Sequence, residues 1–99
     1  MQRLVLRLYV AGDGPNSAAA RANLRRLLAA LEPSSYVLEV IDCLRDPMRA
    51  LQEGILVTPT LVRLEPEPVQ TVVGSLSNGT RVLEALGLFD VGEPVPHDV

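Results

Sequence analysis

The sequence predicts one α/β domain with the element order βαβαββα and a mixed four-stranded sheet. Three observations predict this class. The apolar run Leu4–Val10 is typical of a buried central strand. It is followed by an apolar stripe at helical spacing, and later by two β-rich segments on either side of a proline pair. The chain has 99 residues, of which 47% are hydrophobic, so we expect a single core.

The first helix is predicted from its apolar stripe. The segment Gly12–Ser17 is rich in Gly and Pro and is interpreted as a loop, in which Asn16 or Ser17 offers a helix N-cap. Pro33 closes the segment, so we expect the helix to reach about Leu31. The stripe consists of residues at positions i, i+4, i+7, i+8 and i+11, namely Ala20, Leu24, Leu27, Leu28 and Leu31.

A second strand and a short helix are predicted next. Tyr36–Asp42 is rich in β-formers and partly alternates, which favours a strand. Asp46 and Pro47 are a capping residue and a proline suited to the first helical position. We expect the short helix to run to about Glu53 and to stop at Gly54. Two strands joined by a helix are expected to be parallel.

The third strand is predicted over Ile55–Leu64, although it carries Pro59 near its middle. Proline cannot donate to a sheet ladder, so Pro59 must lie at the start or the edge of the strand. A proline flanked by Thr58 and Thr60 suits a cis peptide bond, and Pro59 is the candidate cis-proline of the chain. Val69–Val73 then forms the partner strand of a hairpin.

A last helix is predicted to begin at Asn78 or Thr80. We assign residues 1–91 to a single domain. Residues 92–99 hold two Pro, two acidic residues and a His, and we expect them to form a flexible C-terminal tail.

Composition excludes several classes of protein. The formal net charge is −3 and no basic cluster is visible, which argues against nucleic-acid binding. No apolar run approaches the roughly 20 residues of a membrane span, and the N-terminal segment lacks the features of a secretory signal. One Cys and one His supply neither a disulfide nor a metal cluster. We expect a cytoplasmic protein without membrane attachment, metal or cofactor.

The element order is that of the thioredoxin-like fold, whose redox enzymes keep a nucleophilic Cys at the start of the first helix. Here that segment, Gly14–Ser17, contains no Cys, and no base is in view to activate Ser17. Cys43 has only Arg45 nearby as an activating cation, so we interpret it as a half-buried filler. The residues alone favour a non-enzymatic binding module. A glutaredoxin-like or glutathione-transferase-like protein that binds thiols or glutathione stays open as the alternative.

Four stretches of the chain resemble the KaiB family in order. They are Leu8–Gly12 followed by Pro15-Asn16-Ser17, then Val40-Ile41-Asp42, then Ile55–Leu61 with its Thr-Pro-Thr, and finally Gly74, Leu76, Ser77, Asn78 and Val82-Leu83. Together they span about residues 4 to 90. Each stretch alone is weak, but the combination is specific.

The resemblance implies a function. KaiB proteins are not enzymes, and they bind the N-terminal ATPase ring of the KaiC hexamer and modulate its ATPase and phosphorylation cycle. In the cyanobacterial clock the complex then captures KaiA and a histidine kinase that shares this fold. The family also switches fold: its ground state is a tetramer of order βαββααβ, and its KaiC-binding state is a thioredoxin-like monomer. The ground-state order is therefore the alternative fold class here, and the free protein is a candidate dimer or tetramer.

Two departures from the family lie in the fold-switch region, which begins at about Leu51. The usual run of three prolines is Pro66-Glu67-Pro68, and the usual Gly-Leu-Asp is Ala85-Leu86-Gly87. Ala in place of Gly favours helix by up to about 1 kcal/mol, and Gly87 suits a helix end. We hypothesise that this protein lies further toward the thioredoxin-like state than clock KaiB.

The resemblance also indicates partners. The residues expected near KaiC lie in the second half of the chain, namely Met48, Leu51, Ile55 and Arg63. Basic residues of clock KaiB proteins are replaced here by Ala19, Gln70 and Thr71, which would weaken binding to an acidic partner. We therefore expect that KaiA is not a partner. A detached sensor domain of the kinase type, acting as a free competitor for KaiC, is a further interpretation.

Overall fold

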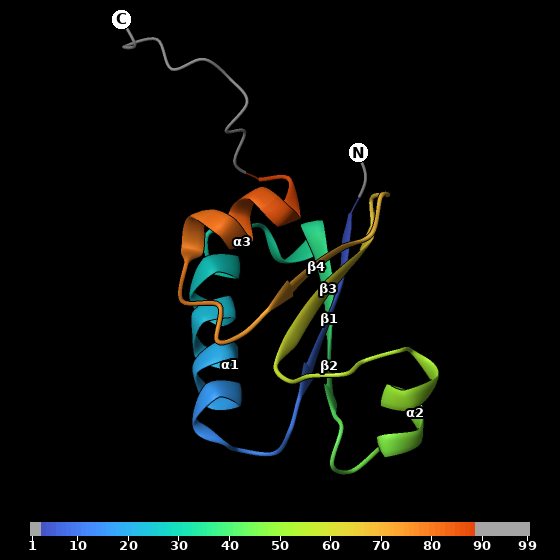
Figure 1. Ribbon diagram of the computed structural model, residues 1–99. Coiled ribbons are helices and arrows are strands. Elements are labelled where there is room, and N and C mark those ends of the chain that lie inside the picture. Colours follow the sequence, from blue (N-terminus) through green and yellow to red (C-terminus); the bar gives the residue numbers. More distant parts are fainter. Residues whose placement is uncertain (1–2, 89–99) are drawn as a thin grey trace, which may run out of the picture.

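A computed structural model describes residues 3–88 of the chain (Figure 1). The helices and strands have the predicted order βαβαββα, with one added turn of 3₁₀ helix at Pro33–Ser35. The elements are β1 (Leu4–Val10), α1 (Pro15–Leu28), β2 (Tyr36–Asp42), α2 (Pro47–Gln52), β3 (Thr60–Glu65), β4 (Gln70–Val73) and α3 (Gly79–Leu86). The tail predicted over residues 92–99, and the domain end predicted at residue 91, lie outside the described residues.

The four strands form one mixed sheet of order β2-β1-β3-β4. β1 is parallel to β2 and antiparallel to β3, and β3 is antiparallel to β4. The parallel pair is joined through α1, as expected for a βαβ unit. Of the two element orders that the sequence leaves open, the structure has the thioredoxin-like one and not βαββααβ. In residues 3–88, no helix is both long and apolar enough to cross a membrane.

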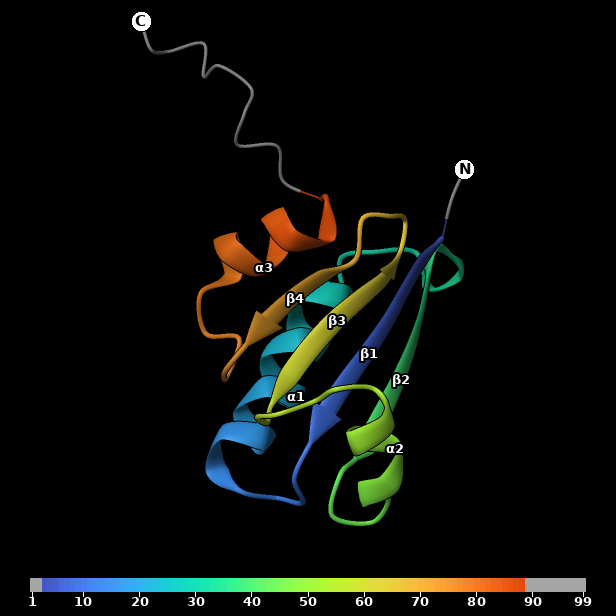
Figure 2. The same ribbon diagram turned by 45° about the vertical axis from the view of Figure 1, so that its right-hand side comes forward.

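The main core lies between the sheet and the pair α1 and α3, which cover the same face (Figures 1 and 2). Side chains alternate along β1, so Leu6 and Leu8 point toward α1, and each is only 1% exposed. The predicted stripe supplies the helical side, and its members Leu27 and Leu31 pack at the margin. The fully buried residues of the stripe are Ala20, Leu24 and Leu28.

The structure corrects both ends of the first helix. The N-cap is Gly14 and not Asn16 or Ser17, because Pro15 takes the first helical position and starts the helix two or three residues earlier. Ser17 lies buried inside the helix, where its Oγ accepts a hydrogen bond of 3.1 Å from the Ala11 N–H. The helix also ends at Leu28, and not near Leu31.

The third strand starts later than the sequence predicts. It begins at Thr60, directly after Pro59, and the segment 55–59 is a loop. Proline has no N–H for the ladder, so the ladder can form only beyond it. The Thr58–Pro59 peptide bond is cis, as are the bonds before Pro66 and Pro68 in the β3–β4 turn.

α3 has a well-defined cap at each end. The Asn78 side chain accepts a hydrogen bond of 3.2 Å from the Arg81 N–H, as an N-cap does. Gly87 ends the helix in the left-handed conformation with φ 77°, which a glycine adopts without steric cost. Val82 and Leu86 lie on the buried side of this helix, facing the core.

Candidate functional site

The other face of the sheet is covered only in part, by α2 and the loop that follows it (Figure 2). α2 starts at its Asp46 N-cap and Pro47, as predicted, and gives way to a turn at Glu53 and Gly54. Of its six residues, only Ala50 is buried. The helix is therefore held against the sheet with little apolar packing of its own.

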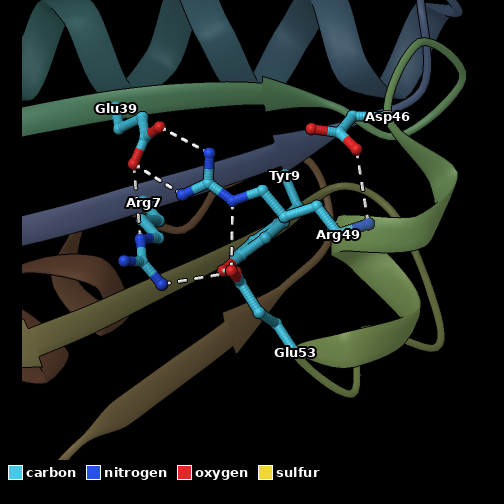
Figure 3. A network of polar contacts seen from close by, with 6 residues as sticks. All are labelled: Arg7, Tyr9, Glu39, Asp46, Arg49 and Glu53. Atoms are coloured by element: carbon cyan, nitrogen blue, oxygen red, sulfur yellow. Dashed lines mark hydrogen bonds and ion pairs between the residues drawn. The ribbon is translucent and has the colours of Figure 1, made fainter.

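Charged and polar side chains attach α2 to the sheet (Figure 3). Arg49 of α2 donates two hydrogen bonds, of 2.7 and 2.9 Å, to the two carboxylate oxygens of Glu39 on β2. Its Nε donates to Glu53 at 3.0 Å. Glu53 also accepts hydrogen bonds from Arg7 and Tyr9 of β1. These five side chains, Arg7, Tyr9, Glu39, Arg49 and Glu53, are called the α2 network below.

The strand register creates the α2 network. Arg7 pairs with Glu39 across the parallel β1–β2 ladder, and their side chains leave the sheet on the same face. Tyr9 lies two residues further along β1, so it shares that face. The network is thus assembled from two adjacent strands and one helix.

The network shifts the pKa values of its members. The hydrogen bonds from Arg49 hold the pKa of Glu39 below its usual value. The hydrogen bond from Tyr9, followed by that from Arg49, lowers the pKa of Glu53. Burial, and then the same contact with Glu53, raises the pKa of Tyr9. Both carboxylates are thereby kept ionised and both arginines charged at neutral pH.

The outer side of α2 presents apolar side chains to solvent. Met48 is 61% exposed and Leu51 is 70% exposed. Leu44 lies just before the helix and Leu56 just after it, and both are exposed too, Leu56 by 91%. Exposed apolar side chains gathered in one region indicate an interaction site. These four residues, Leu44, Met48, Leu51 and Leu56, are called the α2 surface below.

A groove lies beside α2 over the open face of the sheet. Its volume is about 580 Å³, and its lining combines Arg7, Tyr9 and Glu53 of the network with apolar residues. The apolar part comes from the loop 54–57, from β3 and β4 and from the turn between these two strands, and includes the exposed residues Val57, Val69 and Val73. The groove is therefore continuous with the α2 network on one side and with exposed apolar residues on the other.

The structure brings together three of the four residues that the resemblance indicates for KaiC. Met48, Leu51 and Ile55 lie on α2 or in the loop after it, and Ile55 is partly buried against the small cluster that contains Tyr9. Arg63 is elsewhere: it faces α3 on the helix-covered side and is 7% exposed. Its position makes it an internal residue and not part of the same surface.

Sequence reasoning missed Leu56 and the α2 network. Leu56 lay within a run interpreted as a strand, so its exposure could not be expected. Arg7 interrupts an apolar strand, and Glu39 occupies the same relative position in the next parallel strand. That pair of charges inside two otherwise β-rich runs was the available signal for a polar contact on one face.

The candidate redox residues have ordinary structural surroundings. Cys43 is half-buried and packs against the small cluster of Tyr9, Ile41 and Val62. Burial, followed by the charge of Asp42, raises the pKa of its thiol, which is opposite to the activation a nucleophile needs. In the part of the chain that the structure describes, no three His, Cys, Asp or Glu residues gather as metal ligands would.

Two solved structures share the architecture of this chain. The N-terminal domain of SasA from Synechococcus elongatus superimposes with a TM-score of 0.69 at 26% identity, covering 91% of this chain and 89% of that one. A chloroplastic thioredoxin z superimposes with a TM-score of 0.73 at 16% identity, covering 87% and 77% of the two chains. The thioredoxin match shows the fold alone, and that fold is thioredoxin-like.

Sequence comparison shows the family. The circadian clock protein KaiB3 of Synechocystis sp. is 41% identical over 92 residues, which cover 93% of this chain and 90% of that protein. The circadian clock oscillator protein KaiB of Prochlorococcus marinus is 45% identical over 85 residues, covering 86% and 73%. The KaiB domain family model matches residues 7–88. The chain belongs to the KaiB family of circadian clock proteins.

Proposed function

We propose that this protein is a non-enzymatic timing protein that binds the N-terminal ATPase ring of a KaiC hexamer in the cytoplasm and modulates its ATPase and phosphorylation cycle. Its relatives include proteins named circadian clock oscillator protein KaiB, which supports a role in such an oscillator. The raised pKa of Cys43, and a first helix that starts without Cys, give no support to a thiol or glutathione enzyme.

The observation that carries the proposal is the α2 surface. Met48 and Leu51 point away from the protein, although burying each would be worth roughly 1.5–3 kcal/mol. A helix that buries only Ala50 and exposes its larger apolar residues has its apolar side free for a partner. Ile55 supports the turn that connects α2 to the exposed Leu56.

The thioredoxin-like fold is proposed as the KaiC-binding state, which KaiC selects from a pre-existing equilibrium. Ala85 lies inside α3 and Gly87 ends it, so both residues that depart from the family pattern suit this fold. Pro66 and Pro68 shape the β3–β4 turn. We expect the equilibrium to lie further toward this fold than in clock KaiB. Amide NMR tests this: a strand signature over residues 82–89 in the free protein would contradict it.

We propose that KaiA is not a partner. Gln70 and Thr71 are exposed on the edge strand β4 and carry no charge, and Ala19 is only partly exposed on α1. An acidic partner would find no cation at these three positions. Tight capture of a KaiA protein by the complex of this protein with KaiC would refute the proposal.

Size-exclusion chromatography with light scattering tests the main proposal. The protein is run alone and with KaiC hexamer plus ATP. We expect ATP-dependent co-elution, and we expect Leu51→Gln to weaken binding by at least tenfold. Val40→Thr is the matched control, because Val40 is 46% exposed but lies on β2, outside the α2 surface.

Each outcome has a clear meaning. Co-elution with a monomeric free protein supports a pre-formed binding fold. Co-elution with a free dimer or tetramer supports the same partner with a switch before binding. An absence of co-elution under every nucleotide would overturn the proposal. Equal weakening by Val40→Thr would place the binding surface elsewhere than on α2.

A further inference from the structure

A buried arginine on the opposite side of the sheet has incomplete contacts. Arg63 of β3 faces α3 and is 7% exposed. Its Nη2 donates a hydrogen bond of 2.8 Å to the carbonyl oxygen of Pro68. A methyl group placed on Gly87 would come within 3.1 Å of its Nη1. Its Nε is buried and has no hydrogen-bond partner within residues 3–88.

Within residues 3–88, the charge of Arg63 also has no ion-pair partner. The ion pairs within 4.0 Å in the described part of the chain are made by Arg7, Arg21, Arg45 and Arg49, and none is made by Arg63. A guanidinium cannot lose its proton at any physiological pH, so it cannot escape burial by becoming neutral. A buried charge without a partner costs several kcal/mol unless an opposite charge approaches it.

A cavity opens at this arginine. It lies between β4 and α3 and has a volume of about 310 Å³. Arg81, from the first turn of α3, brings a second guanidinium to the lining, and Gln70, which leaves β4 on the same face as the buried Val72, brings an amide. Three side chains able to donate hydrogen bonds, those of Arg63, Gln70 and Arg81, therefore line one hollow, and two of them are charged.

We propose that this hollow binds a carboxylate group, held between Arg63 and Arg81. A guanidinium fork matches the two oxygens of a carboxylate, and both remain charged in use. Glu84 lies on the rim of the same hollow. Its negative charge opposes a doubly charged ligand, so a single carboxylate fits better than a phosphate dianion.

The position of the hollow gives the ligand a structural effect. Arg63 already ties the β3–β4 turn, through Pro68, to the strand that lies beneath α3. A carboxylate bound between Arg63 and Arg81 would add a bridge from β3 to α3. Because it would bind this fold, it would stabilise the fold by mass action. The binding itself does not depend on the proposed role with KaiC.

NMR titration of the full chain with sodium acetate, against sodium chloride at constant ionic strength, tests the proposal. We expect a saturable shift of the Arg63 Nε–H signal and of the Gln70 and Gly87 amides. Arg81→Gln is expected to weaken acetate binding at least fivefold while the fold is kept, because Arg81 is exposed. Arg45→Gln is the matched control, since Arg45 lies in the loop before α2 and its side chain is 88% exposed.

Glu84→Gln removes the opposing charge and is expected to tighten acetate binding. The proposal is overturned if no saturable shift occurs. It is also overturned if Glu84→Gln moves the Arg63 Nε–H signal without acetate and acetate has no effect, since Glu84 would then be the partner of Arg63. Tighter binding of phosphate than of acetate would overturn the assignment to a carboxylate.

A second probe distinguishes the source of the carboxylate. A short peptide with both ends blocked and one aspartate is titrated in the same way. Binding at least tenfold tighter than acetate would support an acidic side chain of a partner protein. Binding no tighter than acetate would support a small free carboxylate. Either result supports the site, and neither depends on whether KaiC binds at α2.

Discussion

The two faces of the sheet are held by different forces. On the helix-covered face, Leu6, Leu8 and Leu24 are each 1% exposed and pack as a continuous apolar core. On the open face, α2 is attached mainly by Arg49 and Glu53, through hydrogen bonds and ion pairs. One face therefore supplies most of the apolar packing of the domain, while the other holds α2 by polar contacts and leaves Met48 and Leu51 exposed.

The difference originates in the alternation along β1. Leu6 and Leu8 leave the strand on one side, and Arg7 and Tyr9 leave it on the other. Apolar burial is not directional and resists salt, whereas partly exposed ion pairs are weak and screened by it. We therefore expect α2 to loosen under conditions that leave α1 and the core in place.

The largest expected effect on stability comes from comparing the same change, Leu to Ala, at one position on each face. Leu24→Ala creates a cavity in the core and is expected to lower the free energy of unfolding by about 3 kcal/mol. Leu51→Ala removes a side chain that is 70% exposed, so its effect is expected to stay within about 0.5 kcal/mol. Urea unfolding followed by circular dichroism measures both.

Their effects on KaiC binding are expected to be reversed. If KaiC binds at the α2 surface as proposed, Leu51→Ala is expected to weaken binding, and Leu24→Ala is expected to leave it unchanged as long as the protein is folded. A loss of more than about 2 kcal/mol on Leu51→Ala would mean that the residue is buried in solution, for example in another fold or oligomer. That result would break the comparison between the two faces.

A smaller effect on the free energy of unfolding is expected for alanine substitutions at the glycines that follow α2 and α3. Gly87 after α3 and Gly54 after α2 both have positive φ, of 77° and 73°. An alanine at Gly87 would also come within 3.1 Å of Arg63, whereas nothing lies within 4 Å of an alanine at Gly54. We expect Gly87→Ala to cost about 2 kcal/mol and Gly54→Ala about 1 kcal/mol or less.

Urea unfolding measures this pair as well. Equal losses for the two variants would show that the loss comes from the positive φ alone. Arg63 would then move aside without cost. A larger cost at Gly54 than at Gly87 would show that α2 is the more firmly held helix, contrary to the comparison.

Most of the fold could be predicted because its signals are local. The helical spacing of Ala20, Leu24 and Leu28 and the β-rich run Tyr36–Asp42 each identify an element without reference to the rest of the chain. The start of β3 could not be placed, because Ile55-Leu56-Val57 has the composition of a strand. Only the position of Pro59, which cannot join the ladder, separates this loop from the strand.

The candidate site was less predictable because it depends on register. Arg7 and Glu39 are 32 positions apart and meet only because β1 and β2 pair in parallel with these two residues opposite each other. The sequence indicated Met48 and Leu51 through family resemblance, and the structure adds their exposure. The resemblance indicated Arg63 as well, but Arg63 leaves β3 on the helix-covered face and is therefore internal.

A modest effect is expected when the α2 network is opened. Arg49→Met removes the contacts to Glu39 and Glu53, and we expect a loss of roughly 0.5–1 kcal/mol, since Glu39 is 47% exposed and its ion pair is screened. Hydrogen exchange is expected to become faster at the amides of α2 but not at those of α1. In 0.5 M salt, the difference in α2 exchange rate between wild type and Arg49→Met should shrink. Unchanged exchange in α2 would show that Ala50 alone holds the helix.

The smallest expected effect is a pH dependence confined to the open face. The hydrogen bonds from Arg49 lower the pKa of Glu39, so its ionised form stabilises the folded state. That contribution is fully present above the unfolded pKa of about 4.3 and is lost as the pH falls through the lower folded value. The stability difference between wild type and Glu39→Gln is thus expected to be constant near neutral pH and to fall in acid. In an Arg49→Met background this pH dependence should largely disappear, because only the weaker contact of 3.4 Å with Arg7 is left. Urea unfolding between pH 3 and 7 measures it, and a difference that grows on acidification would show that Glu39 is held in its protonated form.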